Sequence, residues 1–271
     1  MRRGVDDVKR QYAVTDPLKV RIETHRLYGE RSVDLDAESE RLLGLSGEES
    51  ILDVGCGPAR FLLHLRRNGH HGRLVGLDQS PAMIDEALAT ARDEGFEIDG
   101  ITGDAMGLPF EEGSFDWVSG RHMLYHVPDI PQALREFARV ARKGVLVSTN
   151  GRRNLPSIGE LLDDLLAAFG YAPVQMPSDR FCIENAGEEF DTAGLVADET
   201  TIDNALVFTE VEPIVRYVLS SLPSFELPDE VAVDMEHWVR SHAQRRLDGM
   251  GGTWRDQTHV GFYVATTSPA G

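Results

Sequence analysis

The sequence predicts an α/β fold with a mostly parallel sheet of seven strands and helical cap insertions. Three observations lead to this fold. Short apolar segments alternate with helical patterns from about residue 50 to 150, which is typical of parallel βαβ units. The first apolar segment runs directly into a turn with two glycines, Gly55 and Gly57. Two strand-like segments near the end of the chain, at about 202–209 and 260–266, complete the seven strands.

The core strands are predicted from apolar runs at 51–54, 74–77, 98–102, 115–119 and 145–147. Apolar residues recur at helical spacing between them, at about 61–65, 84–91 and 134–141. The helix at 84–91 begins at Ser80-Pro81, because serine is a good capping residue and proline suits the first helical position. Gly69 and Gly95 are expected to end the first two of these helices.

Three more helices are predicted outside this core, at about 17–29, 158–169 and 235–249. The chain therefore divides into an N-terminal helical lid segment at 1–45, a core at 46–151, a helical cap insertion at 152–186 and the C-terminal part of the core at 187–271. That last part carries a second helical insertion at about 212–250.

The composition narrows the range of partners. The net charge is −18 and no run of Lys or Arg is longer than two residues, so we expect no nucleic-acid partner. No stretch of 18 apolar residues predicts a membrane span, and the charged residues 1–10 are not followed by the apolar run of a secretory signal. Cys56 and Cys182 are too few for a disulfide framework or a zinc cluster. We therefore expect a cytoplasmic protein without a metal.

The glycine turn and an acid further along the chain point to a ligand site. Gly55 and Gly57 allow a sharp turn and a close approach of the backbone to a ligand. Ligands of open α/β sheets bind at the carboxyl ends of the strands, where this turn lies. Asp78 ends the second strand, 25 residues after Asp53, and a carboxylate there can accept from both hydroxyls of an adenosine ribose. The dinucleotide fingerprint G-x-G-x-x-G is incomplete, because Arg60 occupies its last position.

Four ordered motifs carry a family resemblance. ILDVGCGP at 51–58 resembles the first motif of class I S-adenosylmethionine-dependent methyltransferases, and GLDQSPAM at 76–83 resembles their second. GDAMGLPF at 103–110, followed by SFDWV at 114–118, is similar to their third region. LYHV at 124–127 matches a segment common in the branch that methylates quinones, sterols and other small metabolites. The resemblance covers about residues 50–150 and implies that the core at 46–151 is a Rossmann-like, cofactor-binding domain.

The resemblance implies S-adenosyl-L-methionine as the cofactor, with S-adenosyl-L-homocysteine as its product. Gly55 and Gly57 would lie beneath the methionine part, with Cys56 between them as a small filler. Asp53 would lie near the amino group of the methionine, which Arg121 would contact through its backbone carbonyl. Ala59 replaces the third glycine often seen in the first motif, and a small residue there still lets the helix pack.

The nucleoside part is expected to contact residues that follow the second and third strands: Asp78, Gln79, Met83, Asp104, Ala105 and Met106. Asp78 would hold the ribose, and Asp104 would accept from the adenine amino group. The alternative that Asp104 is an ordinary loop acid stays open. Tyr12 is the candidate lid residue, because the N-terminal segment often closes over the cofactor in this branch.

Two histidines are candidates for a general base. His122 and His126 lie four residues apart just after the fourth strand, and one helical turn would put them on one face. An imidazole can accept a proton near neutral pH from a substrate hydroxyl, amine or acidic carbon. The alternative is that this segment packs or shapes the cofactor site. Aromatic and sulfur-containing side chains that could line an apolar acceptor pocket are Tyr171, Met176, Phe181, Trp238 and Trp254.

The expected function is methyl transfer to an O, N or C atom of a small, hydrophobic or aromatic metabolite, by a monomer or homodimer. Two alternatives stay open. The first is a methyltransferase acting on tRNA or protein, against which the acidic charge argues. The second is a protein of the same fold that catalyses a cyclisation or only binds, since the cofactor motifs would look the same.

Overall fold

The computed structural model describes residues 17–173, 177–222 and 229–267. They form two compact units. We call the first the sheet unit; it comprises residues 34–152, 177–202 and 259–267 of the described chain. We call the second the helix unit; it comprises residues 17–33, 153–173, 203–222 and 229–258. All the candidate cofactor and catalytic residues that the structure describes belong to the sheet unit.

The predicted sheet of seven strands is confirmed, in the order β3-β2-β1-β4-β5-β7-β6. The bounds are β1 (Ile51–Val54), β2 (Leu74–Asp78), β3 (Asp99–Thr102), β4 (Phe115–Arg121), β5 (Ala141–Asn150), β6 (Asp198–Phe208) and β7 (Trp254–Thr266). The first five strands pair in parallel, and β7 runs antiparallel to β5. Strands β5, β6 and β7 begin earlier than the apolar runs predicted.

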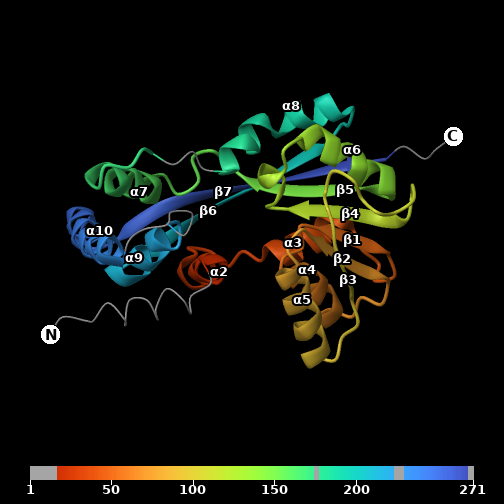
Figure 1. Ribbon diagram of the computed structural model, residues 1–271, viewed down its shortest axis with the longest axis horizontal. Coiled ribbons are helices and arrows are strands. Elements are labelled where there is room, and N and C mark those ends of the chain that lie inside the picture. Colours follow the sequence, from red (N-terminus) through yellow and green to blue (C-terminus); the bar gives the residue numbers. More distant parts are fainter. Residues whose placement is uncertain (1–16, 174–176, 223–228, 268–271) are drawn as a thin grey trace. The chain divides into compact units, whose positions relative to one another are not determined.

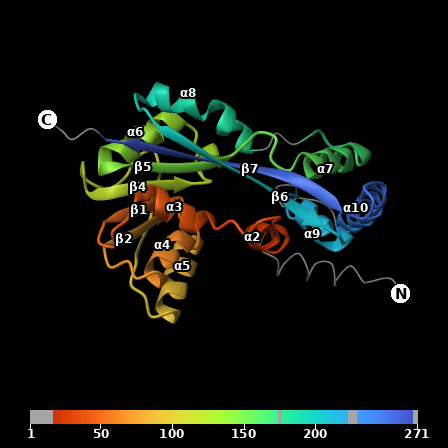
Figure 2. The ribbon, with the colours of Figure 1, turned by 180° about the vertical axis from the view of Figure 1, so that it is seen from behind.

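Helices cover both faces of the sheet within the sheet unit (Figures 1 and 2). Because side chains alternate along a strand, Leu52 and Val54 of β1 join the core beneath α6 (Ile130–Val140) and α8 (Ile183–Ala193). Ile51 faces the other way, into the core formed with α3 (Leu35–Leu43) and α4 (Arg60–Arg67). This double coverage explains why the parallel strands read as continuous apolar runs.

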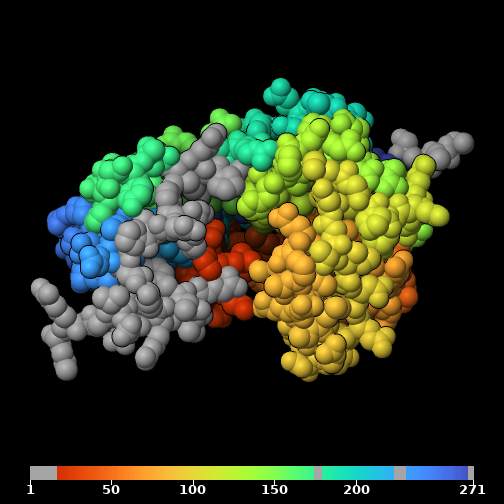
Figure 3. Space-filling model, viewed as in Figure 1, coloured from red at the N-terminus to blue at the C-terminus, as the bar shows by residue number. Residues whose placement is uncertain are grey.

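Helix α5 (Pro81–Asp93) packs along β2 and β3. A Cβ on Gly100 of β3 would lie 2.8 Å from Ile84, so this glycine lets the helix lie close to the strand. The outer side of α5 is exposed, at Asp85 and Asp93 among others, and belongs to the lower, orange-to-yellow surface in Figure 3. Ser80 precedes the helix as predicted, but within the described chain its side chain makes no capping hydrogen bond. The carboxylate of Asp78 stabilises this turn instead, by accepting from the Ser80 amide.

Helix α3 was not predicted, although its boundaries carry ordinary signals. Asp34 caps it by accepting from the amides of Asp36 and Ala37, and Gly44 ends it with a φ of 58°. The buried side of the helix contains Ser39 between Leu35 and Leu43. A serine in the middle interrupts the apolar stripe from which helices are recognised.

The helix unit has its own apolar core. Its helices are α2 (Pro17–Tyr28), α7 (Pro156–Ala168), α9 (Val211–Leu219) and α10 (Asp229–Gly249). The sequence predicts three of these four helices, α7 and α10 from their apolar spacing and α2 from its start at Asp16-Pro17, and it does not predict α9. Asp256 of β7 is 1% exposed and accepts from the amides of Ser157 and Ile158, so it caps the start of α7.

Glu49 stabilises the loop that precedes β1 through buried hydrogen bonds. Its carboxylate accepts from the amide and hydroxyl of Ser46 and from the amide of Gly47, at 2.9–3.1 Å. Burial opposes ionisation, but these hydrogen bonds lower the pKa of Glu49 to about 2.

We expect Glu49→Gln to reduce the free energy of unfolding by about 2–3 kcal/mol at pH 7. A depressed folded pKa stabilises the protein above the unfolded value of 4.5, and this contribution is lost as the pH falls towards 2. Urea denaturation at several pH values should therefore show the two proteins converging below pH 4.5. Glu48→Gln, at the exposed neighbouring position, is the control and should cost less than about 0.5 kcal/mol.

Candidate active site

The turn after β1 is shaped by its two glycines. Gly55 and Gly57 have φ values of 65° and 53°, in the left-handed region that glycine adopts without strain. The amides of Gly55 and Cys56 donate to the carbonyl of Leu77 in β2, at 2.7 and 3.1 Å. No described atom lies within 4 Å of the position that a Cβ on Gly57 would take. The turn is thus tied to β2 and leaves open space beside Gly57.

The two glycines differ in the room around them, which predicts different effects of alanine. A Cβ on Gly55 would lie 2.7 Å from the Cβ of Met123. Both substitutions carry the strain of a left-handed alanine, about 1–2 kcal/mol. We expect Gly55→Ala to cost about 1–3 kcal/mol more than Gly57→Ala, because overpacking adds to this strain. Urea denaturation of both variants measures the difference, and equal losses would contradict the prediction.

Asp78 joins the glycine turn to the end of β2. One carboxylate oxygen accepts from the Gly57 amide and the other from the Ser80 amide, each at 2.9 Å. Each carboxylate oxygen has two lone pairs, so the half-buried Asp78 can still accept two hydrogen bonds. This arrangement suits a ligand with two neighbouring hydroxyls.

Cys56 points into the protein. A Cβ on Gly76 of β2 would lie 2.8 Å from its sulfur, so the thiol fills the space that this glycine leaves. Burial, together with the charges of Asp53 and Asp78, raises the pKa of the Cys56 thiol. A neutral, enclosed thiol is a poor nucleophile, which agrees with the role of a small filler.

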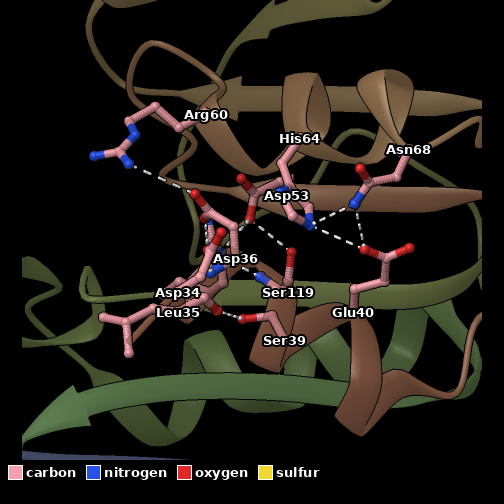
Figure 4. Close-up of polar contacts among 12 residues, drawn as sticks. Asp34, Leu35, Asp36, Ser39, Glu40, Asp53, Arg60, His64, Asn68 and Ser119 are labelled. Atoms are coloured by element: carbon pink, nitrogen blue, oxygen red, sulfur yellow. Dashed lines mark hydrogen bonds and ion pairs between the residues drawn. The ribbon is translucent and has the colours of Figure 1, made fainter. Parts of the chain in front are cut away.

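A buried charge cluster lies beside the turn. Asp53 is 1% exposed, and one of its oxygens accepts from the Ser119 hydroxyl at 2.6 Å. The Nη1 of Arg121 donates to Asp36 of α3 at 2.6 Å, while its Nε lies 3.9 Å from Asp53. The Arg121 guanidinium also stacks on the Phe61 ring, 4.3 Å from its centroid. Figure 4 shows Asp36, Asp53 and Ser119 close together at the end of α3.

The pKa values of the two acids in this cluster are shifted in opposite directions. Burial raises the pKa of Asp53, against the opposing charge of Arg121 and the hydrogen bond from Ser119. Burial also acts on Asp36, but the charge and hydrogen bond of Arg121 outweigh it and lower the pKa of Asp36. The second oxygen of Asp53 is buried and has no hydrogen-bond partner among the described residues. A buried acceptor without a donor is costly, so this atom suits a ligand that brings a donor or a positive charge.

The residues after β3 form a loop next to Asp78. The amide of Gly103 donates to the backbone carbonyl of Asp78 at 3.0 Å. Asp104 is exposed and accepts from the amide of Met106 at 2.9 Å, as in an Asx turn. The Ala105 side chain is buried in the core, so only its backbone can face a ligand.

The remaining nucleoside-side candidates lie on the loop and helix that follow β2. Gln79 is exposed and Met83 is half-buried.

The single helical turn predicted for the two histidines is wrong. His122 has a φ of 51° and donates its amide to the Ser148 carbonyl of β5 at 2.9 Å, so its backbone is left-handed and not helical. Only the 3-10 turn η1 (Leu124–His126) follows, and His126 is exposed on it, with its ring edge-on to Tyr125. A left-handed residue that is not glycine stores strain, as is frequent at functional sites. The two imidazoles therefore have different surroundings.

Several expected acceptor contacts are corrected or lie outside the described chain. Phe181 and Trp254 are fully buried, each in the apolar core of its own unit, so they line no open pocket. Tyr171 and Trp238 pack partly buried against the core of the helix unit. Tyr12 and Met176 lie outside the described residues.

Three residues of the site escaped sequence reasoning. Asp36 and Ser119 contact Arg121 and Asp53, as described above. Arg180, from the 3-10 turn η2 (Pro177–Arg180), donates to the carbonyls of Tyr125 and Val127 and so fixes the loop that carries His126. The Asp34 cap and the Gly44 end were the local signals for α3, and the contacts of Ser119 and Arg180 have no local signal because they are tertiary.

The described part of the chain contains neither a metal cluster nor a membrane-spanning helix. Within it, no three side chains of His, Cys, Asp or Glu gather closely enough to hold a metal ion. None of the helices at 17–173, 177–222 or 229–267 is long and apolar enough to cross a membrane.

The central part of the chain is similar to known methyltransferases. Residues 52–148 match the family described as a methyltransferase domain. A demethylmenaquinone methyltransferase of Lactococcus lactis is 39% identical over 97 residues, which are 35% of this chain and 38% of that protein. The chain thus matches well under half the length of this curated relative. The expectation of a methyltransferase domain is confirmed.

Solved structures share the fold of this chain over most of its length. The YcgJ protein of Bacillus subtilis has a TM-score of 0.57 at 18% identity, covering 86% of this chain and 98% of that chain. The [4+2]-cyclase SpnF has a TM-score of 0.56 at 19% identity, covering 88% of this chain and 80% of that chain. The seven-stranded sheet that contains the matched methyltransferase domain has the class I methyltransferase fold, and this fold also occurs in a protein described as a cyclase.

Proposed function

We infer, from the class I methyltransferase domain that residues 52–148 form, that the protein is an S-adenosylmethionine-dependent enzyme that methylates a small molecule. One observation carries this inference. The carboxylate of Asp78 is joined to the amide of Gly57 at the ends of two neighbouring parallel strands, beside open space. A nucleoside with two ribose hydroxyls fits this arrangement, and the glycine turn admits its close approach.

The residues present fit both ends of S-adenosylmethionine. Asp78 would accept from the ribose hydroxyls, with Gln79, Met83 and the loop from Asp104 to Met106 on the adenine side. Gly55 and Gly57 would lie along the methionine part. Asp53 would face its ammonium, since its second oxygen is buried without a partner in the described chain. The bound cofactor supplies an electrophilic methyl group on a positively charged sulfur.

The protein's part in the reaction is positioning and proton transfer. Holding an acceptor in line with the methyl group converts a bimolecular reaction into an effectively unimolecular one. An acceptor hydroxyl, amine or acidic carbon also loses a proton, and His126 or His122 would take it. Both follow β4, the strand that pairs with β1. Met123, between them, packs against Gly55, so the segment is anchored to the glycine turn.

The acceptor we propose is hydrophobic or aromatic. The relative from Lactococcus lactis is named for demethylmenaquinone, which supports an acceptor of this chemistry. The strongly negative net charge of the chain speaks against an RNA backbone as the acceptor.

A labelled-methyl screen tests the proposal. The full chain is incubated with methyl-labelled S-adenosylmethionine and a panel of apolar, aromatic and charged metabolites, with bulk RNA and protein as further arms. We expect S-adenosylhomocysteine to form only with apolar or aromatic acceptors, and product mass spectrometry to show a gain of one methyl group. Labelling of RNA or protein would overturn the acceptor class. Acceptor conversion without S-adenosylhomocysteine would indicate a non-methylating activity such as cyclisation.

A further inference from the structure

Arg121 is shared unequally between two acids. Its Nη1 lies 2.6 Å from Asp36, whereas its Nε lies 3.9 Å from Asp53. All three side chains are largely removed from water, with 14%, 16% and 2% of their surfaces exposed for Arg121, Asp36 and Asp53. The short contact is a charge-assisted hydrogen bond and the long one is not a hydrogen bond. Asp36 is therefore the primary partner of Arg121.

Asp53 has one carboxylate oxygen that accepts no hydrogen bond from the described residues. Ser119 supplies a hydrogen bond to the same oxygen that faces Arg121, and the other oxygen is buried without a partner in the described part of the chain. If Asp36 did not hold Arg121, the guanidinium would need to move only about one ångström to bond to Asp53 directly. Arg121 already lies within ion-pair distance of Asp53, and a direct hydrogen bond would tighten this pair and weaken the attraction of Asp53 for an incoming cation.

We propose that Asp36 is a positioning residue that holds Arg121 back from Asp53 and thereby keeps Asp53 available for the ammonium group of the cofactor. The inference rests on the proposed function, because it takes that ammonium as the partner of Asp53. It assigns α3, which lies outside the matched domain at 52–148, a part in cofactor affinity. Asp36 itself contacts no cofactor in this proposal and acts through Arg121.

The test compares two ligands that differ in the ammonium. S-adenosylhomocysteine carries it, and 5′-deoxy-5′-methylthioadenosine has the same nucleoside and thioether but no amino acid part. Calorimetry on the full chain should show that Asp36→Asn lowers the affinity for S-adenosylhomocysteine about tenfold. The affinity for methylthioadenosine should change less than about twofold. Asp36→Glu keeps the charge and should retain most of the affinity for both ligands.

Matched variants separate positioning from loosening of the helix. Glu40 lies on the same helix and bonds to His64 and Asn68 of the α4 segment, at 2.9 Å each, without touching Arg121 (Figure 4). Glu40→Gln should therefore leave both affinities unchanged. Adding Arg121→Gln to Asp36→Asn removes the competing cation and should restore much of the affinity for S-adenosylhomocysteine.

Three results would overturn the inference. The first is an equal loss of affinity for both ligands in Asp36→Asn. The second is a loss of affinity in Glu40→Gln that matches the loss in Asp36→Asn. The third is unchanged binding of S-adenosylhomocysteine in Asp36→Asn. Should Asp36→Asn fail to fold, the double variant Asp36→Asn/Arg121→Gln decides between the two roles: affinity for S-adenosylhomocysteine close to that of the natural chain supports positioning, and an equal loss of affinity for both ligands overturns it. A natural chain that binds neither ligand would overturn the proposed function itself, and so the two failures are distinguishable.

Discussion

Replacing Asp78 with alanine is expected to raise the Kd for S-adenosylhomocysteine by about 100-fold or more. The carboxylate orders the turn by accepting from the amides of Gly57 and Ser80. In the proposed complex it also accepts from the two ribose hydroxyls. Hydrogen bonds to a charged group contribute about 1.5–3 kcal/mol each, so losing two of them corresponds to about 10²–10⁴-fold in affinity.

Calorimetric titration of the full chain measures this effect, and circular dichroism monitors the fold. Asp85→Ala is the matched control, because Asp85 is an exposed acid on the neighbouring helix α5. We expect it to bind S-adenosylhomocysteine like the natural chain. A folded Asp78→Ala protein with less than about fivefold weaker binding would mean that Asp78 only stabilises the turn.

The parallel strands of the methyltransferase domain could be predicted because burial on both faces makes each a continuous apolar run. The glycines at 55 and 57 and the acid at 78 then follow from local needs: left-handed backbone at the turn and an acceptor at the end of the next strand. These residues lie close together because each follows a strand of the parallel sheet, and the carboxyl ends of neighbouring parallel strands meet at one edge.

The contacts around Arg121 could not be predicted in this way. Asp36 and Arg121 are 85 residues apart, and their ion pair exists only because α3 packs on α4 beside the end of β4. The serine that interrupts the apolar face of α3 concealed the helix and with it the acid in its first turn. The resemblance predicted a backbone contact for Arg121, and the structure adds a side-chain network.

The histidine pair shows a different limit. Spacing of four residues predicts one helical face only if the backbone is helical, and the left-handed conformation of His122 breaks that condition. Packing of Met123 against Gly55 and the pairing of the His122 amide with Ser148 override the local preference. Both histidines follow β4 as predicted, but their relative orientation depends on tertiary contacts.

His126→Gln is expected to lower kcat by about 10²–10⁴-fold while the Kd for S-adenosylhomocysteine stays within about twofold. His126 is exposed, so its imidazole is accessible to an acceptor, and Arg180 holds the loop on either side of it. The proton must be accepted by a neutral imidazole, so kcat of the natural enzyme should fall as acidification protonates that imidazole. The variant should lack this acidic limb.

The pH profile distinguishes a base from a residue that only shapes the site. His71→Gln, at an exposed position before β2, is the control and should keep both the rate and the acidic limb. If His122→Gln, rather than His126→Gln, removes the limb, the strained residue is the base and His126 packs the loop. If both variants keep the limb and turn over within about threefold of the natural enzyme, then neither histidine takes the proton, and alignment of the acceptor supplies the rate.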